Sequence, residues 1–220
     1  MAAINRVLFG LAALAVAAVL CLCNWLFLYT GDLPKTDQLS DFAPKAEGHS
    51  ATDACLAGPS LVIPFDRIGK PFQDALTSAE PSNTYAYEIA RTLMCNKRES
   101  PAKYQLSVFR LAWHIRRRFS EQELLTIYAN RAYFGPAATG VDNASRQFFQ
   151  KEVSALTVEE AALLAGVLRG QAYSPFKHFD LALHRRNQIL ETMAAQGKLS
   201  AKELARATAA PMSIRPSAPD

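Results

Sequence analysis

The sequence is poor in cysteine and in charge. Its 220 residues include 4 cysteines, and no two of them form a C-x-x-C pair. This excludes a disulfide-rich scaffold and a structural zinc site built on such a pair. The 4 histidines also lack the spacing of metal ligands. Only 20% of the residues are charged and 50% are hydrophobic, which excludes disorder of the chain as a whole.

The excess of positive charge is also small. Lys and Arg number 24 against 20 Asp and Glu, which gives a formal net charge of +4. A charge of this size permits contact with anionic lipid but gives no argument for nucleic acid, and we predict no nucleic-acid partner. The length predicts one domain with an appendage.

The longest uncharged stretch lies near the amino terminus, from Val7 to Gly31. As a helix it rises about 37 Å, which is enough to cross the hydrocarbon core of a bilayer. Trp25 and Tyr29 lie where an interfacial aromatic belt is expected. A cleaved signal peptide is the alternative, but it has a shorter apolar region and a small-residue cleavage site. We therefore predict that residues 1–32 form a cytoplasmic tip and a single transmembrane anchor.

The charges around this anchor predict its orientation. Arg6 and the amino terminus precede it, whereas mostly acidic residues follow it. The positive-inside rule then places the amino terminus in the cytoplasm and exports the rest of the chain. The prediction is a single-pass membrane protein with an extracytoplasmic C-terminal domain; if the cell is a Gram-negative bacterium, this means the bacterial inner (cytoplasmic) membrane and a periplasmic domain. Cys55 and Cys95 would lie in an oxidising compartment, and the sequence leaves their pairing open.

Composition divides the exported part into three segments. Residues 33–58 mix Pro, Asp, Ser, Gly and Ala without periodicity, which indicates a tether. Residues 205–220 are rich in Ala and Pro, which indicates a flexible tail. The folded domain is therefore expected over residues 59–204.

Helical signals dominate the folded domain. Capping boxes of the form S/T-x-x-E begin at Ser120, Thr157 and Ser200, and apolar residues follow them at helical spacing. The best strand signal, at residues 61–63, is weak. The predicted fold class is mainly α, with roughly seven to nine helices.

One predicted helix concentrates positive charge. The segment from Lys97 to Arg118 holds seven basic residues and a single acid, Glu99. One face of this helix carries Lys103, Ser107, Arg110, His114 and Arg117. The other faces are apolar, which predicts a largely buried helix whose basic stripe faces a cleft or the membrane surface. A phosphate or pyrophosphate site and a solvated stripe both remain open as interpretations.

A longer motif resembles a known family. The run from Phe119 to Asn130, followed by Tyr133-Phe134-Gly135, is similar to the pattern Y-S-K-x-E-I-L-E-x-Y-L-N-x-x-Y-F-G. This pattern belongs to the peptidoglycan glycosyltransferases, glycosyltransferase family 51, which form the transglycosylase domain of penicillin-binding proteins and the monofunctional transglycosylases. The resemblance covers about residues 62–200, and the chain looks like a shortened, divergent member.

The resemblance implies a lysozyme-like helical fold with a cleft at the membrane surface, where the family polymerises lipid II. A glutamate acts there as general base on a sugar hydroxyl. Basic residues and a second glutamate, often through a divalent metal, assist the departing pyrophosphate.

Several positions of the family motifs are changed in this chain. Glu80 falls where the general base belongs, but about thirty residues that usually follow are missing, as the family resemblance implies. Tyr104 and Gln105 replace the basic pair of the third motif, and Val108 replaces the second glutamate, a position at which the family binds its metal. Thr126 replaces the glutamate of the fourth motif. We therefore predict no metal site and no cofactor.

The residues carried over from the family form the predicted site. Glu80 is the candidate general base. The candidate substrate-binding residues are Thr84, Lys103, Arg110, His114, Asn130, Arg185 and Arg186. Each has a structural alternative: Glu80 as a carboxylate at a helix end, Asn130 as a holder of helix and turn geometry, and the two C-terminal arginines as salt-bridge partners within the fold.

Three functional hypotheses follow. The preferred one is a peptidoglycan glycosyltransferase-like protein that acts on or binds lipid II or nascent glycan, with weakened or lost catalysis. The alternative is an active lipid II polymerase with Glu80 as general base. A lysozyme-like glycan cleaver is a remote third. The expected partners are membrane lipid, lipid II or a glycan strand, and cell-wall synthases. The sequence leaves open the activity, the oligomeric state, the exact ligand and whether a partner completes the cleft.

Overall fold

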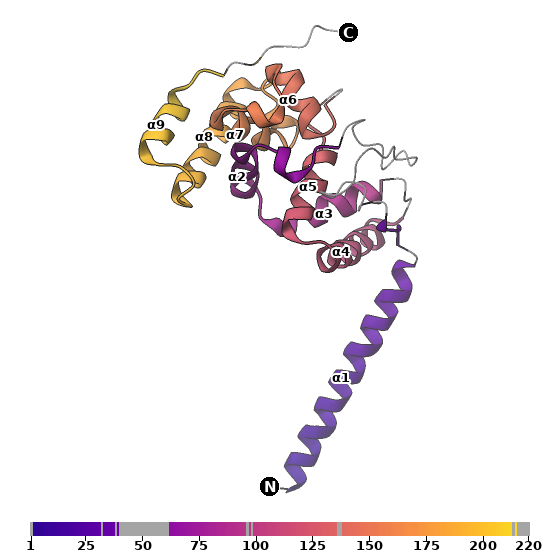
Figure 1. The fold of residues 1–220 in the computed structure, drawn as a ribbon. Helices are drawn as coiled ribbons and strands as arrows, with labels where there is room; N and C mark the ends of the chain where they lie inside the picture. Colours follow the sequence, from indigo (N-terminus) through magenta and orange to yellow (C-terminus); the bar gives the residue numbers. More distant parts are fainter. Residues whose placement is uncertain are drawn as a thin grey trace.

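The computed structural model describes residues 2–31, 33–37, 39, 62–95, 97, 99–135, 138–212 and 214. Over these residues the chain is mainly helical, as predicted (Figure 1). The α-helices are α1 (Ala2–Thr30), α2 (Lys70–Ala79), α3 (Ser82–Leu93), α4 (Pro101–Arg118), α5 (Glu121–Arg131), α6 (Val141–Phe149), α7 (Val158–Val167), α8 (Phe179–Ala195) and α9 (Ala201–Ala209). Short 3-10 turns are η2 (Phe65–Arg67), η3 (Val153–Ala155) and η4 (Gln171–Tyr173).

The described residues contain no β-strand. The weak strand signal at residues 61–63 therefore gives no strand at residues 62 and 63, the two of the three that the structure describes. An isolated bridge between Tyr133 and Thr139 closes the turn that leads into α6.

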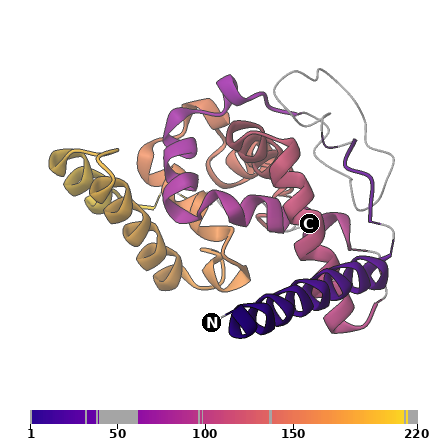
Figure 2. The ribbon, with the colours of Figure 1, turned by 90° about the horizontal axis from the view of Figure 1, so that it is seen from below.

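The helices of the domain pack in two groups. In one group α7 packs between α2 and α8, and α9 lies along α8. In the other group α3 packs against α4 and α5. Figure 2 shows the same arrangement from below, with α1 passing beside α4. The short connection from α2 to α3 links the two groups, so the residues at that connection touch both.

All three predicted capping boxes are present, at the starts of α5, α7 and α9. Ser120, Thr157 and Ser200 each accept a hydrogen bond from the backbone N–H three residues on, and the glutamate there accepts one from the backbone N–H of the cap residue. These reciprocal bonds satisfy backbone donors that a helix start otherwise leaves open. The starts of these three helices were therefore predictable to the residue.

Two predicted boundaries differ from the structure. Helix α9 continues to Ala209, so the boundary predicted at residue 205 falls inside a helix rather than at the start of a tail. Alanine is the strongest helix former, and the alanine-rich composition indicated helix rather than looseness. The residues after α1 also join the domain, because Leu39, within the segment predicted as a tether, is fully buried.

Helix α1 extends away from the domain on its own (Figure 1). Within α1, the structure describes the exposure of residues only at Gly10 and at 12–25. Within this part and the rest of the described chain, no helix has the length and apolar character that crossing a membrane requires.

Candidate functional site

The connection between α2 and α3 places the candidate general base. Glu80 ends α2 in an extended conformation, with φ −142° and ψ 136°, and Pro81 then precedes the first turn of α3. Tyr85, one turn into α3, donates its hydroxyl to the Glu80 carbonyl over 3.2 Å. Burial, and to a lesser extent the negative charge of Glu80, raises the pKa of Tyr85, so this hydroxyl stays a donor. The backbone at Glu80 is therefore fixed from both sides.

The carboxylate of Glu80 is buried in an ion pair with two arginines. Its side chain is only 10% exposed. Its Oε1 lies 3.3 Å from Nη1 of Arg169, which follows α7, and 3.9 Å from Nη2 of Arg185, on α8. Arg185 also donates to the carbonyl of Ala79 over 3.1 Å. The structure thus brings together two predicted site residues, Glu80 and Arg185, and adds Arg169.

Arg169 carries no motif signal and was missed by the sequence analysis. It lies two residues after the end of the buried helix α7, and no sequence pattern there indicates that its side chain meets Glu80. Gly166 on α7 makes room for the second arginine, because a Cβ at this position would lie 3.1 Å from Cγ of Arg185. The glycine and both arginines therefore serve the same cluster.

This arrangement restrains the chemistry available to Glu80. A general base needs a carboxylate oxygen within hydrogen-bonding reach of the substrate hydroxyl. Here Oε1 is shared by two guanidinium groups, and Glu80 lines neither of the two pockets described below. Thr84 lies four residues on, half-buried in the first turn of α3, where its N–H donates to the Pro81 carbonyl over 2.9 Å.

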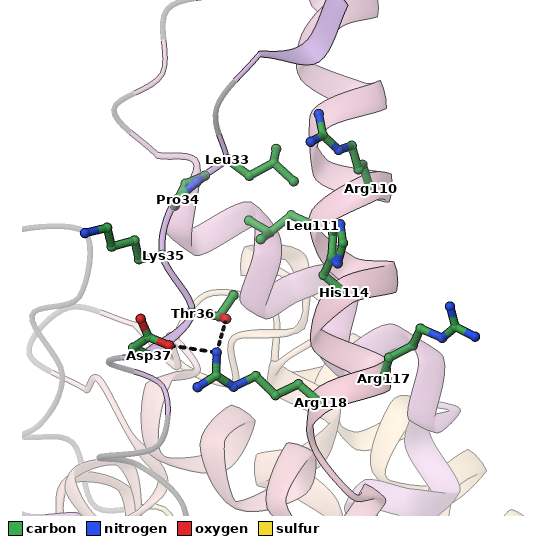
Figure 3. Close-up of a pocket in the computed structure, with 10 residues that line it drawn as sticks. All are labelled: Leu33, Pro34, Lys35, Thr36, Asp37, Arg110, Leu111, His114, Arg117 and Arg118. Carbon is green, nitrogen blue, oxygen red and sulfur yellow. Dashed lines mark hydrogen bonds and ion pairs between the residues drawn. The ribbon is translucent and has the colours of Figure 1, made fainter. Parts of the chain in front are cut away.

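A larger pocket lies between α4 and the segment that follows α1 (Figure 3). Its volume is about 550 Å³. It is lined by Leu33, Pro34, Lys35, Thr36, Asp37, Arg110, Leu111, His114, Arg117 and Arg118. The predicted basic stripe therefore does face a cleft over its C-terminal half, as expected from its spacing.

Two arginines hold this pocket together. Arg110 donates to the carbonyl of Gly31 over 3.1 Å. Arg118 donates to the Thr36 hydroxyl over 3.1 Å and pairs with Asp37 at 2.7 Å. Arg110 and His114 thus lie together at the junction of α1 and the domain, in a pocket that Glu80 does not line.

The N-terminal half of the basic stripe is occupied by local contacts. Lys103 lies 3.7 Å from the carboxylate of Glu99, and the buried hydroxyl of Ser107 donates to the same carboxylate over 3.2 Å. Lys103 is therefore on the same helix as Arg110 but does not line the pocket.

Two further predicted residues act within the fold. Asn130 is buried, accepts from the N–H of Ile63 over 2.8 Å and donates to the carbonyl of Ile63 over 2.8 Å. Arg186, 1% exposed, donates to the carbonyls of Thr208 and Ala210, each over 2.9 Å. Desolvation lowers the pKa of Arg186, and the nearby charge of Glu159 offsets this in part. Asn130 therefore holds the fold, as its structural alternative predicts. Arg186 also holds the fold, but through backbone carbonyls rather than through the expected salt bridge.

The replaced motif positions are also integrated into the fold. Val108 is completely buried, Gln105 accepts from the hydroxyl of Tyr87 over 3.0 Å, and the buried Thr126 donates to the Gln122 carbonyl over 2.8 Å. No cluster of three or more His, Cys, Asp or Glu suited to a metal ion occurs in the part of the chain that the structure describes.

A second, smaller pocket was not expected from the sequence. Its volume is about 190 Å³. It lies between α3, the end of α5 and Leu168, and its polar lining includes Glu88, Thr92, Tyr128 and Tyr133. Burial is the main cause of a raised pKa at Tyr128.

Comparison with known proteins identifies the family. The fold and the motif remnants describe a helical domain that carries the sequence pattern of peptidoglycan glycosyltransferases. The family model described as Transglycosylase matches residues 84–194, half of the chain, and the protein belongs to this family. The match begins after Glu80, so the candidate general base lies outside the matched residues.

Several penicillin-binding proteins are similar to this chain. Penicillin-binding protein 1A/1B of Bacillus subtilis is 34% identical over 155 residues, which are 69% of this chain and 16% of that protein. Penicillin-binding protein 1A of Aquifex aeolicus is 32% identical over 134 residues, which are 60% of this chain and 18% of that protein. The chain thus spans less than a fifth of the length of these relatives.

A solved structure confirms the fold of the family. The crystal structure of penicillin-binding protein 1A from Haemophilus influenzae aligns with a TM-score of 0.51 at 20% identity. The alignment covers 71% of this chain and 18% of that one.

Proposed function

We propose that this protein is a membrane-anchored, peptidoglycan glycosyltransferase-like protein that binds lipid II or nascent glycan in cell-wall synthesis, with weakened or lost catalysis. Membership of the transglycosylase family supports the ligand class. The retained scaffold, with polar motif positions replaced, supports binding over turnover.

The state of Glu80 is the observation that carries this proposal. A carboxylate that must take a proton from a sugar hydroxyl has to face the substrate. The Glu80 side chain is instead only 10% exposed and pairs with Arg169 and Arg185. This ion pair connects the end of α2 to Arg169, which follows α7, and to Arg185 on α8, so the carboxylate stabilises the packing of these helices.

The residues that would assist the leaving group are also replaced. A pyrophosphate leaving group needs positive charge placed in advance. The basic pair of the third motif is Tyr104 and Gln105 here, and the buried Val108 offers no oxygen to a divalent metal. The proposed function therefore needs no metal or cofactor. Thr84 and Arg185, near Glu80, are the predicted residues best placed to meet a glycan at the α2–α3 connection.

The anchor and the location belong to the same proposal. Helix α1 stands apart from the domain, and its described apolar side chains, including Leu14, Leu20 and Trp25, are more than half exposed. Exposed leucines on an isolated helix are favourable in lipid and unfavourable in water. We therefore propose that α1, over its full length from Ala2 to Thr30 rather than over its described side chains alone, spans the bacterial inner membrane once. The domain then lies outside the cytoplasm, beside membrane lipid and cell-wall synthases.

Polymerisation of labelled lipid II by the full chain in detergent tests the proposal. The wild type and Glu80→Gln are compared, under conditions in which an active member of the family forms polymer. We expect no glycan ladder from either protein. A ladder from the wild type that Glu80→Gln abolishes would instead establish an active polymerase with Glu80 as general base.

A stability measurement separates the two roles of this carboxylate. If Glu80 serves the fold, Glu80→Gln lowers the free energy of unfolding by about 2 kcal/mol, because the arginines lose a charged partner. The matched control is Glu152→Gln. Glu152 is 62% exposed and pairs only loosely with Arg146, at 3.5 Å. Its replacement is expected to change stability by less than about 0.5 kcal/mol.

Binding is tested separately from turnover. Lipid II in nanodiscs should retain the wild-type chain more strongly than lipid-only nanodiscs do. Equal retention would contradict the binding proposal even if no polymer forms.

A further inference from the structure

The exposed side of α4 carries large aromatic side chains. Phe109 is 61% exposed and Trp113 is 53% exposed. They are four residues apart, so they form one ridge along the helix, which we call the α4 ridge. The apolar faces of this helix predicted that Phe109 and Trp113 are buried, and this prediction is wrong. Leu111 and Ile115, on the opposite side, are buried and attach α4 to the domain.

Basic side chains flank the α4 ridge. Helix α4 contains five basic residues and no acidic one. Arg116 and Arg117, near its C-terminal end, are exposed. The guanidinium of Arg117 lies over the Trp113 ring, with its Cζ 4.3 Å from the ring centroid. The ridge therefore combines exposed aromatic rings with adjacent positive charge.

The α4 ridge lies beside the point where α1 meets the domain. Helix α4 contacts α1, and Arg110 donates to the carbonyl of Gly31, the residue that follows α1. Figure 1 shows α4 at the edge of the domain from which α1 extends. In Figure 3, Arg110 and His114 extend from α4 on the side of this junction, whereas the guanidinium of Arg117 points away from it.

We propose that the α4 ridge docks on the surface of a bilayer that contains anionic phospholipid. Trp113 and Phe109 enter the headgroup region, while Arg116 and Arg117 contact the phosphates. This inference rests on the proposed anchor only for orientation: a span ending at Thr30 holds α4 at the height of the headgroups.

The chemistry of the ridge favours an anionic lipid surface. Tryptophan and other amphipathic aromatics concentrate at the membrane interface. Helices with exposed aromatics and arginines lie in the plane of anionic membranes. Each basic residue near such a surface contributes about fivefold to the docking equilibrium. The complementary charge therefore identifies lipid phosphates as the occupant of this face.

Tryptophan quenching by brominated phospholipid tests the docking on the full chain. The sequence has 2 tryptophans, so Trp25→Phe leaves Trp113 as the only tryptophan whose fluorescence is measured. The protein is reconstituted in vesicles of phosphatidylcholine alone or mixed with phosphatidylglycerol. We expect strong quenching of Trp113 in the anionic vesicles and weak quenching in the neutral ones.

Two matched variants make the test specific. Replacing both flanking arginines, Arg116→Gln with Arg117→Gln, should weaken docking roughly 25-fold, so quenching in anionic vesicles falls to the neutral level. A tryptophan introduced as Phe179→Trp, with Trp25 and Trp113 both changed to Phe, reports an equally exposed site, since Phe179 is 50% exposed. It lies on α8, away from α4 (Figure 1), and should stay unquenched.

The outcomes distinguish the docking from the anchor. In the variant Trp113→Phe, quenching of Trp25 reports insertion of α1. Trp25 quenched with Trp113 unquenched in anionic vesicles overturns the docking and leaves the anchor standing. Quenching of Trp113 that ignores lipid charge and both arginines overturns the assignment of an anionic surface. Trp25 left unquenched overturns the anchor, and quenching of Trp113 is then tested by itself.

Discussion

At the scale of single residues, a motif position retained from a family can serve the fold rather than the reaction. Asn130 ends a recognisable family motif, yet its side-chain amide forms hydrogen bonds with backbone groups of the domain. It bonds both the N–H and the carbonyl of Ile63, 67 residues away, and also the carbonyl of Thr126. Ile63 belongs to no strand among the described residues, and Asn130 bonds to both of its backbone polar groups, as a neighbouring strand would.

Replacing this amide should destabilise the domain. Asn130→Ala leaves the backbone N–H and carbonyl of Ile63 buried without these partners, which costs about 3 kcal/mol. Asn143→Ala is the matched control, because the partly buried Asn143 side chain donates one hydrogen bond, to the Thr139 carbonyl over 2.9 Å. Urea unfolding monitored by circular dichroism measures both. Equal midpoints for the two variants would show that the Asn130 bonds contribute no more than a surface cap.

The site was only partly predictable at this scale. The motifs located Glu80 and Arg185, and the structure brings these two together. Nothing in the sequence indicated Arg169, because a partner supplied across the fold leaves no local pattern. The predicted set was also divided: Arg110 and His114 line the pocket at α1, whereas Arg186 holds the C-terminal end of α9.

At the scale of elements, local rules performed well. The capping boxes fixed the starts of α5, α7 and α9 because a cap involves residues only three apart. The spacing on α4 correctly placed Arg110, His114 and Arg117 on one side. It did not reveal that Phe109 and Trp113 are exposed, because periodicity groups residues on faces without saying which face the domain covers.

The cap of α9 makes a prediction about pH. Hydrogen bonds from the Ser200 hydroxyl and then from its backbone N–H lower the pKa of Glu203 below its ordinary value of 4.5. Because the pKa is lowered in the folded state, this contribution to stability is present above that ordinary value. It is lost as the pH falls through the lowered pKa. Helix α9 should therefore begin to fray only as the pH falls below 4.5.

Carboxyl-carbon NMR titration and amide hydrogen exchange measure this effect. Ser200→Ala should raise the pKa of Glu203 toward 4.5 and speed exchange in α9 at neutral pH. Ser100→Ala is the control, since Ser100 occupies the same cap position on α4 without a side-chain cap bond. A pKa of Glu203 that does not respond to Ser200→Ala would show that the cap is not its cause.

At the scale of the whole molecule, contacts between distant segments determine how the domain closes. The family resemblance predicted the helical fold class correctly, but no sequence pattern showed which helices meet. The same limit applies to the cysteines. Cys95 takes part in a disulfide, whereas Cys55, the partner considered from the sequence, lies outside the described residues.

The segment that leads into α2 shows how tight this closure is. Asn130 on α5 holds Ile63, and six residues later Gly69 passes against η3. A Cβ at Gly69 would lie 2.9 Å from the carbonyl oxygen of Val153 and 3.0 Å from Cα of Ser154. Both neighbours are backbone atoms, so a side-chain rotation cannot relieve the contact. The glycine is needed for space rather than for a left-handed conformation, because its φ is −52°.

Gly69→Ala should therefore separate the start of α2 from η3 and destabilise the domain by about 2 kcal/mol, the usual cost of overpacking. Gly10→Ala is the control, because no atom lies within 4 Å of a Cβ at Gly10. Thermal unfolding compares the two variants. If both leave the midpoint unchanged, the chain can shift η3 without cost, and the first turn of α2 is not held by this contact. If only Gly69→Ala lowers it, the position of α2, and with it the Glu80 carboxylate at its end, depends on a backbone contact made far away in the sequence.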